Sequence, residues 1–528
     1  MSTTPPPEPE PYDVLVVGAG PTGMTAACEL LRRGVRVRVV DRAPEPSPLP
    51  KALLVWPRSL DLFEDLGILD DLRAAALQIN AFSYFSDRTR LATFDFPQHL
   101  APLCLPQNET EEVLRRRMHS LGGKVEHGVR LLTLEDLDFA GRVDGTGPVT
   151  AVLEHADGRV ERTRAPFVIG TDGASSAVRA QLGSGFEGST YESAFALVDA
   201  RIEGTLPPDQ ALYYQSPAGA LVIVALPDGV YRFFSSLAPG ESAGLERMQQ
   251  IVDERGPRGV RLVEPLWETV FRIHARHAGT YQLGRVFIAG DAAHVHSPAG
   301  GQGMNTGMQD AHNLAWKIAA VVRGEAPAAL LRDYGAERSA VVRRVVRDTD
   351  IQTRGWLVRG RLAVAARDAA FRAAERTGAF RLYAPVMAGR RLSYPARRPT
   401  QLPSGRGGCA ARAKLPGALE VGAVFPRELA LAHGIAGPGA QAPGWTLAVV
   451  CRGTAAAWRT QLRALAAPWP QVRAVDLAAG SARRPTGCGR AGYYLIRPDG
   501  HIAAHGHERD TGRLLEELTA WLGPAARD

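Results

Sequence analysis

The sequence predicts an α/β protein with a Rossmann-type nucleotide-binding domain, an inserted antiparallel sheet and a smaller α/β domain at the C-terminus. Three patterns carry this prediction. A strand, a glycine-rich turn, a helix and a second strand follow one another over residues 13–41. Alternating strands joined by turns fill much of 186–278, which is typical of an antiparallel sheet. Beyond a Pro/Gly/Arg-rich stretch at 395–415, strands and helices resume.

Length and composition suit a soluble protein of several domains. The 528 residues allow three or four domains, if each takes about 150 residues. Hydrophobic residues make up 45% and charged residues 22% of the chain, which is ordinary for globular proteins. The net charge of +7 comes from scattered arginines, without a basic block interleaved with aromatics. No nucleic-acid partner is therefore expected.

The cysteines and the N-terminus indicate a cytoplasmic protein. The five cysteines lie too far apart for a disulfide framework or a zinc site: Cys28, Cys104, Cys409, Cys451 and Cys488. This usage fits a reducing compartment. Residues 1–11 form a Pro/Glu-rich tail that we expect to be disordered and that lacks the features of a signal peptide. No apolar run approaches the roughly 18 residues that cross a membrane, so no membrane association is expected.

The first element is a nucleotide-binding fingerprint. Asp13–Val17 predicts a buried strand, a helix runs to about Arg33, and a second strand, Val35–Val40, ends at Asp41. The turn between strand and helix reads Gly18-Ala19-Gly20-Pro21-Thr22-Gly23. Its glycines make room for a pyrophosphate at the helix N-terminus, and Asp41 would accept the ribose hydroxyls. The pattern predicts a dinucleotide without separating FAD from NAD.

The next elements are a helix, strands and a second turn. A helix is expected over 57–67, strands over 81–104, and another helix from Gln107. Pro166–Gly170 predicts a further buried strand, followed by Asp172 in a turn and by a short helix. Strands are expected at 195–202, 211–215, 221–226 and 230–235. Four aromatic residues on these strands are candidates for a substrate pocket, although most should be core: Tyr213, Tyr214, Phe233 and Phe234.

The stretch 284–324 combines a strand, a ligand loop and a helix. Val286–Ala289 predicts a strand, and Gly290-Asp291 then stands at its carboxyl end, where open α/β sheets bind ligands. Glycines at 300, 301 and 303 let backbone approach a flat ligand. The helix expected from about Thr306 directs its positive N-terminus into that loop, which favours a ring that becomes anionic on reduction. His294 and His296 lack a third ligand nearby, so no metal is expected.

This stretch resembles the GD motif of the FAD-dependent aromatic (class A) monooxygenases, the family of para-hydroxybenzoate, phenol and polyketide hydroxylases. The fingerprint at 18–23 and the DG-type segment around Asp172 occur in the family's order. The resemblance implies that Asp291 contacts the flavin ribitol, with Pro298 and Asn305 as catalytic residues beside the ring. It further implies that the flavin is held by Gly290, Gly301, Gly303 and Met304.

Other segments are similar to further motifs of the family. Arg42 would lie against the adenosine, although a plain surface role fits it equally. Lys51 stands where the family usually has arginine, which keeps the charge but loses the planar fork. Gln107 matches a glutamine that packs near the flavin ribityl chain and ring. Asp172, with an arginine one turn into the next helix, suits both the pyrophosphate and the nicotinamide cofactor.

The C-terminal part resembles the thioredoxin-like domain of the larger family members. Helices are expected over 331–394, a linker over 395–415, and this domain over 416–528. Where thioredoxins have CxxC, the chain reads Cys451-Arg-Gly-Thr454. A single cysteine cannot cycle a dithiol, so the domain is expected to be structural.

The resemblance implies the domain ranges and the reaction. The FAD-binding domain would comprise 12–80, 105–185 and 280–330, and the substrate domain 81–104 and 186–279. NAD(P)H would reduce FAD, and O2 would give a flavin C4a-hydroperoxide that hydroxylates a phenolic or polycyclic, polyketide-type aromatic in secondary-metabolite biosynthesis. Baeyer–Villiger oxidation or epoxidation on the same scaffold, and a flavin dehydrogenase or oxidase, stay open. A homodimer is also suggested, while the substrate residues are not identified.

Overall fold

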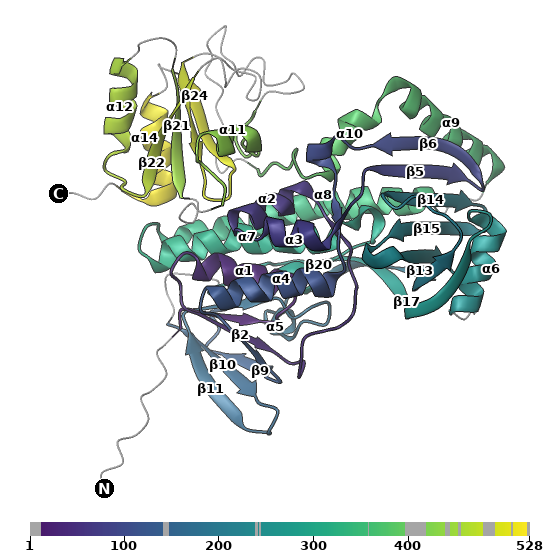
Figure 1. Ribbon diagram of the computed structural model, residues 1–528. Coiled ribbons are helices and arrows are strands. Elements are labelled where there is room, and N and C mark those ends of the chain that lie inside the picture. The colour runs from purple at the N-terminus through teal and green to yellow at the C-terminus, as the bar shows by residue number, and fades with distance from the viewer. Residues whose placement is uncertain are drawn as a thin grey trace.

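The computed structural model places three bodies side by side (Figure 1). A six-stranded sheet with its helices lies in the middle, an eight-stranded sheet on one side, and a smaller C-terminal domain on the other. The structure describes residues 12–140, 147–237, 241, 244–356, 358, 360–395, 419–438, 444–451, 456–478, 491–507 and 511–524. The predicted tail at 1–11 and most of the predicted linker, 396–415, lie outside these ranges.

The central sheet has the strand order β18-β19-β12-β1-β2-β8 and is parallel except for β18. Its strands are β1 (Val14–Val17), β2 (Val37–Asp41), β8 (Val125–His127), β12 (Phe167–Gly170), β18 (Gln282–Leu283) and β19 (Val286–Ile288). The main helices are α1 (Pro21–Leu31), α4 (Gln107–Ser120), α5 (Ala177–Gln181) and α7 (Gly303–Val322). Every residue of β1, β12 and β19 is buried, as expected for parallel strands covered on both faces. The predicted fingerprint elements are confirmed.

Two small sheets and the helix α3 were not predicted, whereas α2 was, and β7 falls within the strands predicted over 81–104. The strands β9 (Arg130–Glu135), β10 (Val149–Glu154) and β11 (Val160–Ala165) form an antiparallel sheet. The strands β3 (Leu54–Val55), β4 (Leu77–Gln78) and β7 (Leu103–Cys104) form another. The helices α2 (Pro57–Asp65) and α3 (Leu69–Ala75) lie between β3 and β4. Because β3, β4 and β7 have only two residues each, their sequence carries no usable period.

The larger sheet has the strand order β20-β17-β13-β16-β15-β14-β5-β6. Its strands are β5 (Ala81–Ser86), β6 (Thr89–Asp95), β13 (Phe186–Glu203), β14 (Gln210–Ser216), β15 (Gly219–Ala225), β16 (Val230–Ser236), β17 (Arg261–Ala278) and β20 (His294–Val295). The sheet is antiparallel, as predicted, except that β14 pairs with β5 in parallel. The helix α6 (Leu245–Arg255), which was not predicted, packs on one face through Met248 and Ile251. The other face is left to line a cavity.

The chain then crosses the molecule to the C-terminal domain. The connecting helices are α8 (Asp333–Trp356), α9 (Arg361–Thr377) and α10 (Phe380–Met387). The domain contains α11 (Arg427–Ala432), β21 (Trp445–Cys451), α12 (Ala456–Ala466), β22 (Val472–Ala478), β23 (Gly492–Ile496), β24 (Ile502–His507) and α14 (Thr511–Leu522). Its sheet order is β22-β21-β23-β24; β22 and α11 were not predicted. Residues 452–454 of the CxxC-like position lie outside the described ranges.

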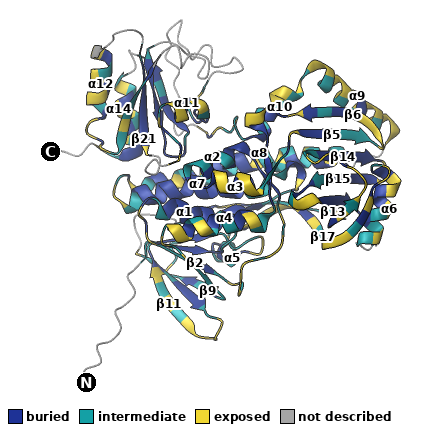
Figure 2. Ribbon diagram, in the orientation of Figure 1, coloured by how far each residue is buried: buried dark blue, intermediate teal, exposed yellow. Residues whose placement is uncertain are grey.

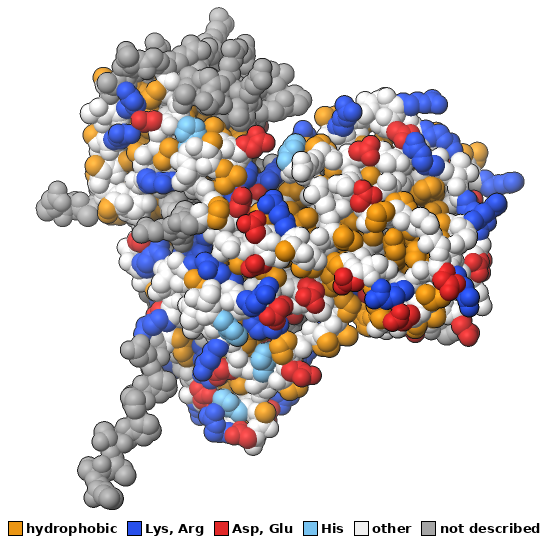
Figure 3. Space-filling model, viewed as in Figure 1, with side chains coloured by type: hydrophobic (Ala, Val, Ile, Leu, Met, Phe, Trp, Pro, Cys, Tyr) orange, Lys and Arg blue, Asp and Glu red, His pale blue; other side chains and the backbone are white. Residues whose placement is uncertain are grey.

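Burial differs sharply between the helices. Helix α7 is buried along most of its length, whereas α9 is largely exposed (Figure 2). Basic and acidic side chains are interspersed over the face drawn in Figure 3.

Short 3-10 helices complete the fold: η1 (Gln98–Leu100), η2 (Pro227–Gly229), η3 (Gly290–Ala292), η4 (Ala299–Gly301) and η5 (Ala328–Arg332). Within the described residues, no helix is both long and apolar enough to cross a membrane.

Candidate active site

One large cavity runs from the first turn of the central sheet to the inner face of the eight-stranded sheet. Its volume is about 1100 Å³, above the roughly 300–1,000 Å³ of most small-molecule pockets. The predicted site residues that line it are Gly18, Gly20, Pro21, Thr22, Asp41, Arg42, Lys51, Gln107, Asp172, Asp291, Pro298, Gly301, Gly303 and Met304. Gly23, Gly290 and Asn305 lie just behind that lining.

The glycines of the first turn are required by close backbone contacts. Gly18 has φ +104°, and a Cβ there would lie 2.4 Å from the carbonyl oxygen of Thr171. A Cβ on Gly23 would lie 1.9 Å from the carbonyl oxygen of Gly18. A Cβ on Gly20 would meet nothing within 4 Å. The N-terminus of α1 therefore faces open space, which is the arrangement that binds a pyrophosphate.

Asp41 is fixed at the end of β2 by two backbone donors. Its Oδ2 accepts a 2.7 Å hydrogen bond from Ala19 N, and its Oδ1 accepts one of 2.8 Å from Ala43 N. Each carboxylate oxygen has a further lone pair, so the group can still accept ribose hydroxyls. The adjacent Arg42 is exposed and lines the cavity.

A buried ion pair of the eight-stranded sheet holds the loop that carries Lys51. Arg232 on β16 donates two 2.7 Å hydrogen bonds to Asp199 on β13. The same guanidinium donates to the carbonyl oxygens of Pro50 and Lys51. Gln107 supports the loop from the other side, because its Oε1 accepts a 3.2 Å hydrogen bond from Ala52 N. Sequence reasoning missed Arg232, since a lone arginine in a strand gives no signal.

The turn after β19 presents Asp291 to the cavity. Gly290 has φ +60°, and a Cβ there would lie 2.5 Å from Thr22 Oγ1. The Gly290 amide donates a 3.0 Å hydrogen bond to Asp310 on α7. The side chain of Asp291 is exposed and lines the cavity, while desolvation by the surrounding protein raises its pKa. A ligand hydroxyl in the cavity could therefore donate a hydrogen bond to the Asp291 carboxylate.

The side chain of Asn305 forms hydrogen bonds with the protein behind the cavity lining. Its Oδ1 accepts a 2.8 Å hydrogen bond from Trp56 N, and its Nδ2 donates to the carbonyl oxygens of Leu54 and Gly301 at 2.7 and 2.9 Å. The side chain thus ties the segment around β3 to the glycine loop. Helix α7 begins at Gly303, three residues before the predicted start.

Two histidines follow Asp291, and they have different environments. His294 Nε2 donates a 2.6 Å hydrogen bond to Asp310. His296 Nδ1 donates to the carbonyl oxygen of Ser297 at 2.9 Å, and burial lowers its pKa to about 4. His296 is therefore neutral at pH 7, and its Nε2, without a hydrogen-bond partner among the described residues, can accept one from a ligand. Those residues contain no group of three metal-binding side chains.

Asp172 lines the cavity, but its carboxylate forms hydrogen bonds with the N-terminus of helix α5. Its carboxylate accepts hydrogen bonds from Ser176 Oγ at 2.5 Å, Ala177 N at 2.7 Å and Val178 N at 3.2 Å. Arg179 in the same helix reaches the carbonyl oxygen of Ala292 at 2.9 Å. The segment therefore braces the turn that carries Asp291.

The far half of the cavity is an aromatic wall. Of the four candidates, Tyr213 and Phe234 line the cavity, whereas Tyr214 and Phe233 pack into the core beneath α6. Strand alternation requires this division. Phe271 of β17 and Trp356 of α8 also line this half of the cavity. We call these four residues the aromatic wall: Tyr213, Phe234, Phe271 and Trp356. Phe271 was hidden in an unassigned strand and Trp356 in a helix far along the chain.

Comparisons with known proteins agree with this geometry. Residues 11–349 match the family described as FAD binding domain, and 446–525 match the C-terminal domain of aromatic-ring hydroxylases. The 6-methylpretetramide 4-monooxygenase of Streptomyces rimosus is 35% identical, with 98% of this chain and 94% of that protein aligned. The anhydrotetracycline hydroxylase OxyS of Streptomyces rimosus has a TM-score of 0.75 at 27% identity, covering 98% of this chain and 100% of that one. Aklavinone-11 hydroxylase, solved with FAD and aklavinone, has a TM-score of 0.73 at 26% identity, covering 97% and 99%.

Proposed function

The chain belongs to the family of FAD-dependent aromatic-ring monooxygenases, and from this we propose that it hydroxylates a polycyclic phenol of the polyketide type. Its cofactor is FAD, with NAD(P)H and O2 as co-substrates. The observation that carries the substrate proposal is the continuity of the cavity. A single space joins the pyrophosphate turn at Gly18 to the aromatic wall.

The residues fit FAD at each point along this space. Open room beyond Gly20, a fixed carboxylate at Asp41, an exposed carboxylate at Asp291 and the glycine loop at 300–303 match pyrophosphate, ribose, ribitol and ring in turn. We assign Asp291 to the ribitol, Asp41 to the adenosine ribose, and Arg42 to the adenosine. Lys51, Gln107, Pro298 and Met304 would border the ring. Asp172 and Arg179 would act beside the pyrophosphate.

Bound FAD would supply the redox chemistry, by which hydride from NAD(P)H and oxygen from O2 lead to one new C–O bond on the substrate. The chain's own groups prepare the place for it. The N-terminus of α7 at Gly303 offers free N–H groups that stabilise negative charge at the edge of the ring. The neutral His296 offers an acceptor, and the apolar walls exclude water. Asn305 acts through the shape of the loop, by tying it to β3.

The aromatic wall supports a large, flat substrate. Phe234 and Phe271 lie 5.7 Å apart at 25° between rings, and Tyr213 and Trp356 lie 5.7 Å apart. Such rings offer both stacking and edge contacts to a fused aromatic. The relative aligned over nearly all of this chain is named for 6-methylpretetramide, and aklavinone was bound in a similar structure.

We further propose the domain ranges 12–80, 105–185 and 280–330 for FAD binding, with 81–104 and 186–279 for substrate. The sheet membership of most strands supports this division, although β7 and β20 cross it. A cytoplasmic homodimer is proposed from the family resemblance alone. Sedimentation velocity would test the dimer, and cell fractionation the location.

The proposed function is tested by NADPH oxidation in air with FAD-loaded protein and a panel of polycyclic phenols. A substrate should stimulate oxidation about tenfold or more, because family members couple flavin reduction to substrate binding. With 18O2, its product should gain one labelled oxygen atom, as seen by mass spectrometry. Unlabelled product, with flavin bleached anaerobically by the phenol alone, would instead identify a dehydrogenase.

A further inference from the structure

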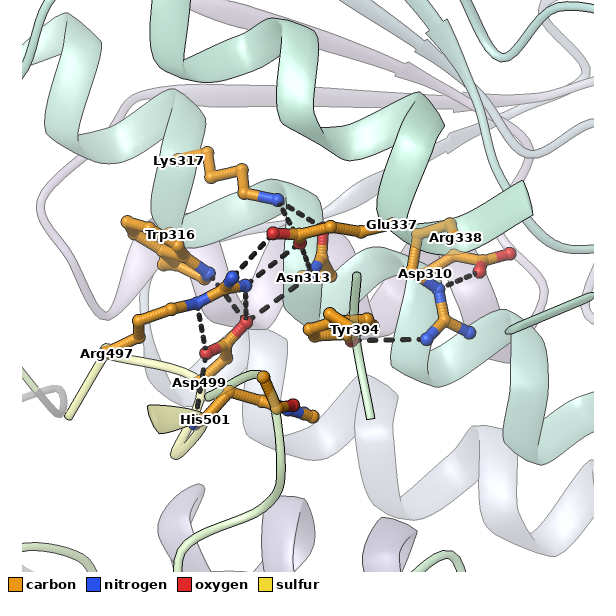
Figure 4. Close-up of polar contacts among 11 residues, drawn as sticks. Asp310, Asn313, Trp316, Lys317, Glu337, Arg338, Tyr394, Arg497, Asp499 and His501 are labelled. Atoms are coloured by element: carbon orange, nitrogen blue, oxygen red, sulfur yellow. Dashed lines mark hydrogen bonds and ion pairs between the residues drawn. The ribbon is translucent and has the colours of Figure 1, made fainter. Parts of the chain in front are cut away.

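A buried charge network joins the C-terminal domain to the flavin side of the molecule (Figure 4). It starts at the turn between β23 and β24, where the Asp499 carboxylate accepts hydrogen bonds from Arg497 Nε at 3.0 Å and Nη2 at 2.5 Å. Asp499 also accepts a 3.1 Å hydrogen bond from Trp316 Nε1 on α7. The turn is therefore fastened directly to the long helix of the FAD-binding part.

The second carboxylate in the network is Glu337 on α8. It accepts two hydrogen bonds from Arg497, of 2.5 and 3.0 Å, which cross from the C-terminal domain. It also accepts a 2.7 Å hydrogen bond from Lys317 Nζ and one of 2.8 Å from Asn313 Nδ2, both on α7. Glu337 thus holds α7, α8 and the C-terminal turn at one point.

The next residue of α8 continues the network towards the cavity. Arg338 donates a 2.6 Å hydrogen bond to Asp310, and 3.2 Å hydrogen bonds to Tyr394 and to the carbonyl oxygen of Thr306. Tyr394 stacks on His501 of the C-terminal domain with ring centres 4.1 Å apart. Arg338 is therefore braced from the same domain that supplies Arg497.

The third carboxylate, Asp310, reaches the cofactor site itself. Its Oδ2 accepts hydrogen bonds from Gly290 N at 3.0 Å and from His294 Nε2 at 2.6 Å. Gly290 is the backbone of the turn that presents Asp291, and His294 lines the cavity. Three linked carboxylates, Asp499, Glu337 and Asp310, thereby lead from the C-terminal turn to the predicted ribitol site.

The charges in this network depend on one another. The side chains of the three carboxylates and of Arg497, Lys317 and Arg338 are at most 5% exposed. Three negative and three positive groups therefore balance away from water. Burial opposes ionisation of the carboxylates, but Arg497 and Lys317 lower the pKa of Glu337 to about 2. A buried ion that loses its partner is strongly destabilised, so its neighbours must rearrange.

We infer that Asp499 and Arg497 are positioning residues for the FAD site, acting through Glu337, Arg338 and Asp310 on the turn at Gly290–Asp291. The inference deepens the proposed function and rests on it. Consecutive residues of α8 carry Glu337 and Arg338, so a shift at the first moves the second. The C-terminal domain, whose sequence has no CxxC motif, would then serve the cofactor as a clamp on α7 and α8.

The test compares Asp499→Asn with Asp476→Asn, the same change in the same domain. Asp476 pairs with Arg463 at 3.0 Å in a half-exposed surface contact. Apoprotein is titrated with FAD at a temperature where circular dichroism shows each variant folded. Hydrogen exchange of the amides over 290–306 is followed in the same apoproteins. Asp499→Asn should raise the FAD Kd about 3- to 30-fold and speed exchange at Gly290 and its neighbours.

Asp476→Asn should leave both readouts within about twofold of the parent. Removing Arg497 and Glu337 together, as R497Q/E337Q, should weaken FAD binding less than either single change, because the charge balance is restored. A folded Asp499→Asn protein with FAD affinity and exchange within about twofold of the parent would overturn the inference.

If Asp499→Asn does not fold, the same two measurements are made on Tyr394→Phe. This change removes only the hydroxyl that accepts from Arg338, and it should still weaken FAD binding and loosen 290–306, whereas unchanged values would overturn the inference. These readouts involve no aromatic substrate. Failure of the proposed function would appear separately, as a parent protein that binds no FAD or yields no oxygenated product.

Discussion

Asn305 and Trp56 lie 249 residues apart in the chain, yet the Asn305 side chain accepts a 2.8 Å hydrogen bond from the Trp56 amide. Asn305 Nδ2 in turn donates hydrogen bonds to the carbonyl oxygens of Leu54 and Gly301. Asn305→Ala should lower the free energy of unfolding by about 2–4 kcal/mol, because buried backbone groups lose partners at about 1–3 kcal/mol each. Urea unfolding measures this. Asn80→Ala, which removes an exposed amide, is the control, and an equal loss for both would contradict the assignment.

The glycine at 290 should be less replaceable than its dihedral angle alone suggests. Gly290 and Gly34 both have positive φ, +60° and +76°, but only at Gly290 would a Cβ clash, at 2.5 Å from Thr22 Oγ1. Gly34→Ala should cost only the strain of about 1–2 kcal/mol. Gly290→Ala should cost more and should also weaken FAD binding. Thermal unfolding and FAD titration of both variants check this, and equal effects would show that the clash is relieved cheaply.

Stability should fall below pH 6.5 because His296 and His501 are neutral in the fold. Burial lowers the pKa of His296 to about 4 and that of His501 to about 3. Both are depressed from 6.5, so the unfolded chain binds more protons between that value and the folded pKa, and stability is lost as pH falls through this window. Each group contributes a slope of about 1.4 kcal/mol per pH unit.

The histidine prediction is tested by urea unfolding of apoprotein from pH 7 to pH 4.5, above the range in which Glu337 titrates. His501→Phe keeps an aromatic ring beside Tyr394 and removes the titrating group, so its stability should decline less steeply than that of the parent. His99→Phe, at an exposed position, is the matched substitution. An unchanged slope in His501→Phe would show that His501 becomes protonated without unfolding.

Removing one ring of the aromatic wall should weaken substrate binding with little effect on FAD. Trp356 contacts Tyr213 and Phe234, with ring centres 5.7 and 6.5 Å apart. Trp356→Ala should raise KM for the best phenol about 3- to 10-fold, since aromatic contacts are worth about 0.5–1.5 kcal/mol each. The KM of Trp356→Phe should lie between those of Trp356→Ala and the parent protein. A changed FAD Kd with unchanged KM would place Trp356 outside the substrate region.

The sequence predicted those parts of the fold in which local pattern and function coincide. The turn at Gly18–Gly23 and the strand before Gly290 carry glycines and apolar runs that few other structures require. The sheet β9–β11 was missed because its outer strand, Val160–Ala165, is exposed on alternate residues and contributes little apolar signal. Two-residue strands such as β3 are defined only by their partners.

At the site, sequence reasoning pointed to residues that stand at strand ends and missed residues that reach the cavity through tertiary packing. Asp41 and Asp291 stand at strand ends, where position in the chain already implies position in space. Arg232 and Trp356 reach the cavity from distant elements through tertiary packing, which no local pattern records. That Asn305 acts beside the ring stays a prediction, whereas its contacts with Leu54 and Trp56, whose buried backbone groups need partners, were not foreseen.

The order of strands in the central sheet also has a consequence for biosynthesis. Strand β1 pairs on one side with β2, which follows it closely in the chain, but its other neighbour, β12, begins only at Phe167. The ribosome, adding about 5–20 residues per second, needs roughly 6–25 s to go from the end of β2 at Asp41 to β12. Until then one edge of the apolar strand β1 stays open, so the nascent chain should depend on a chaperone during this interval.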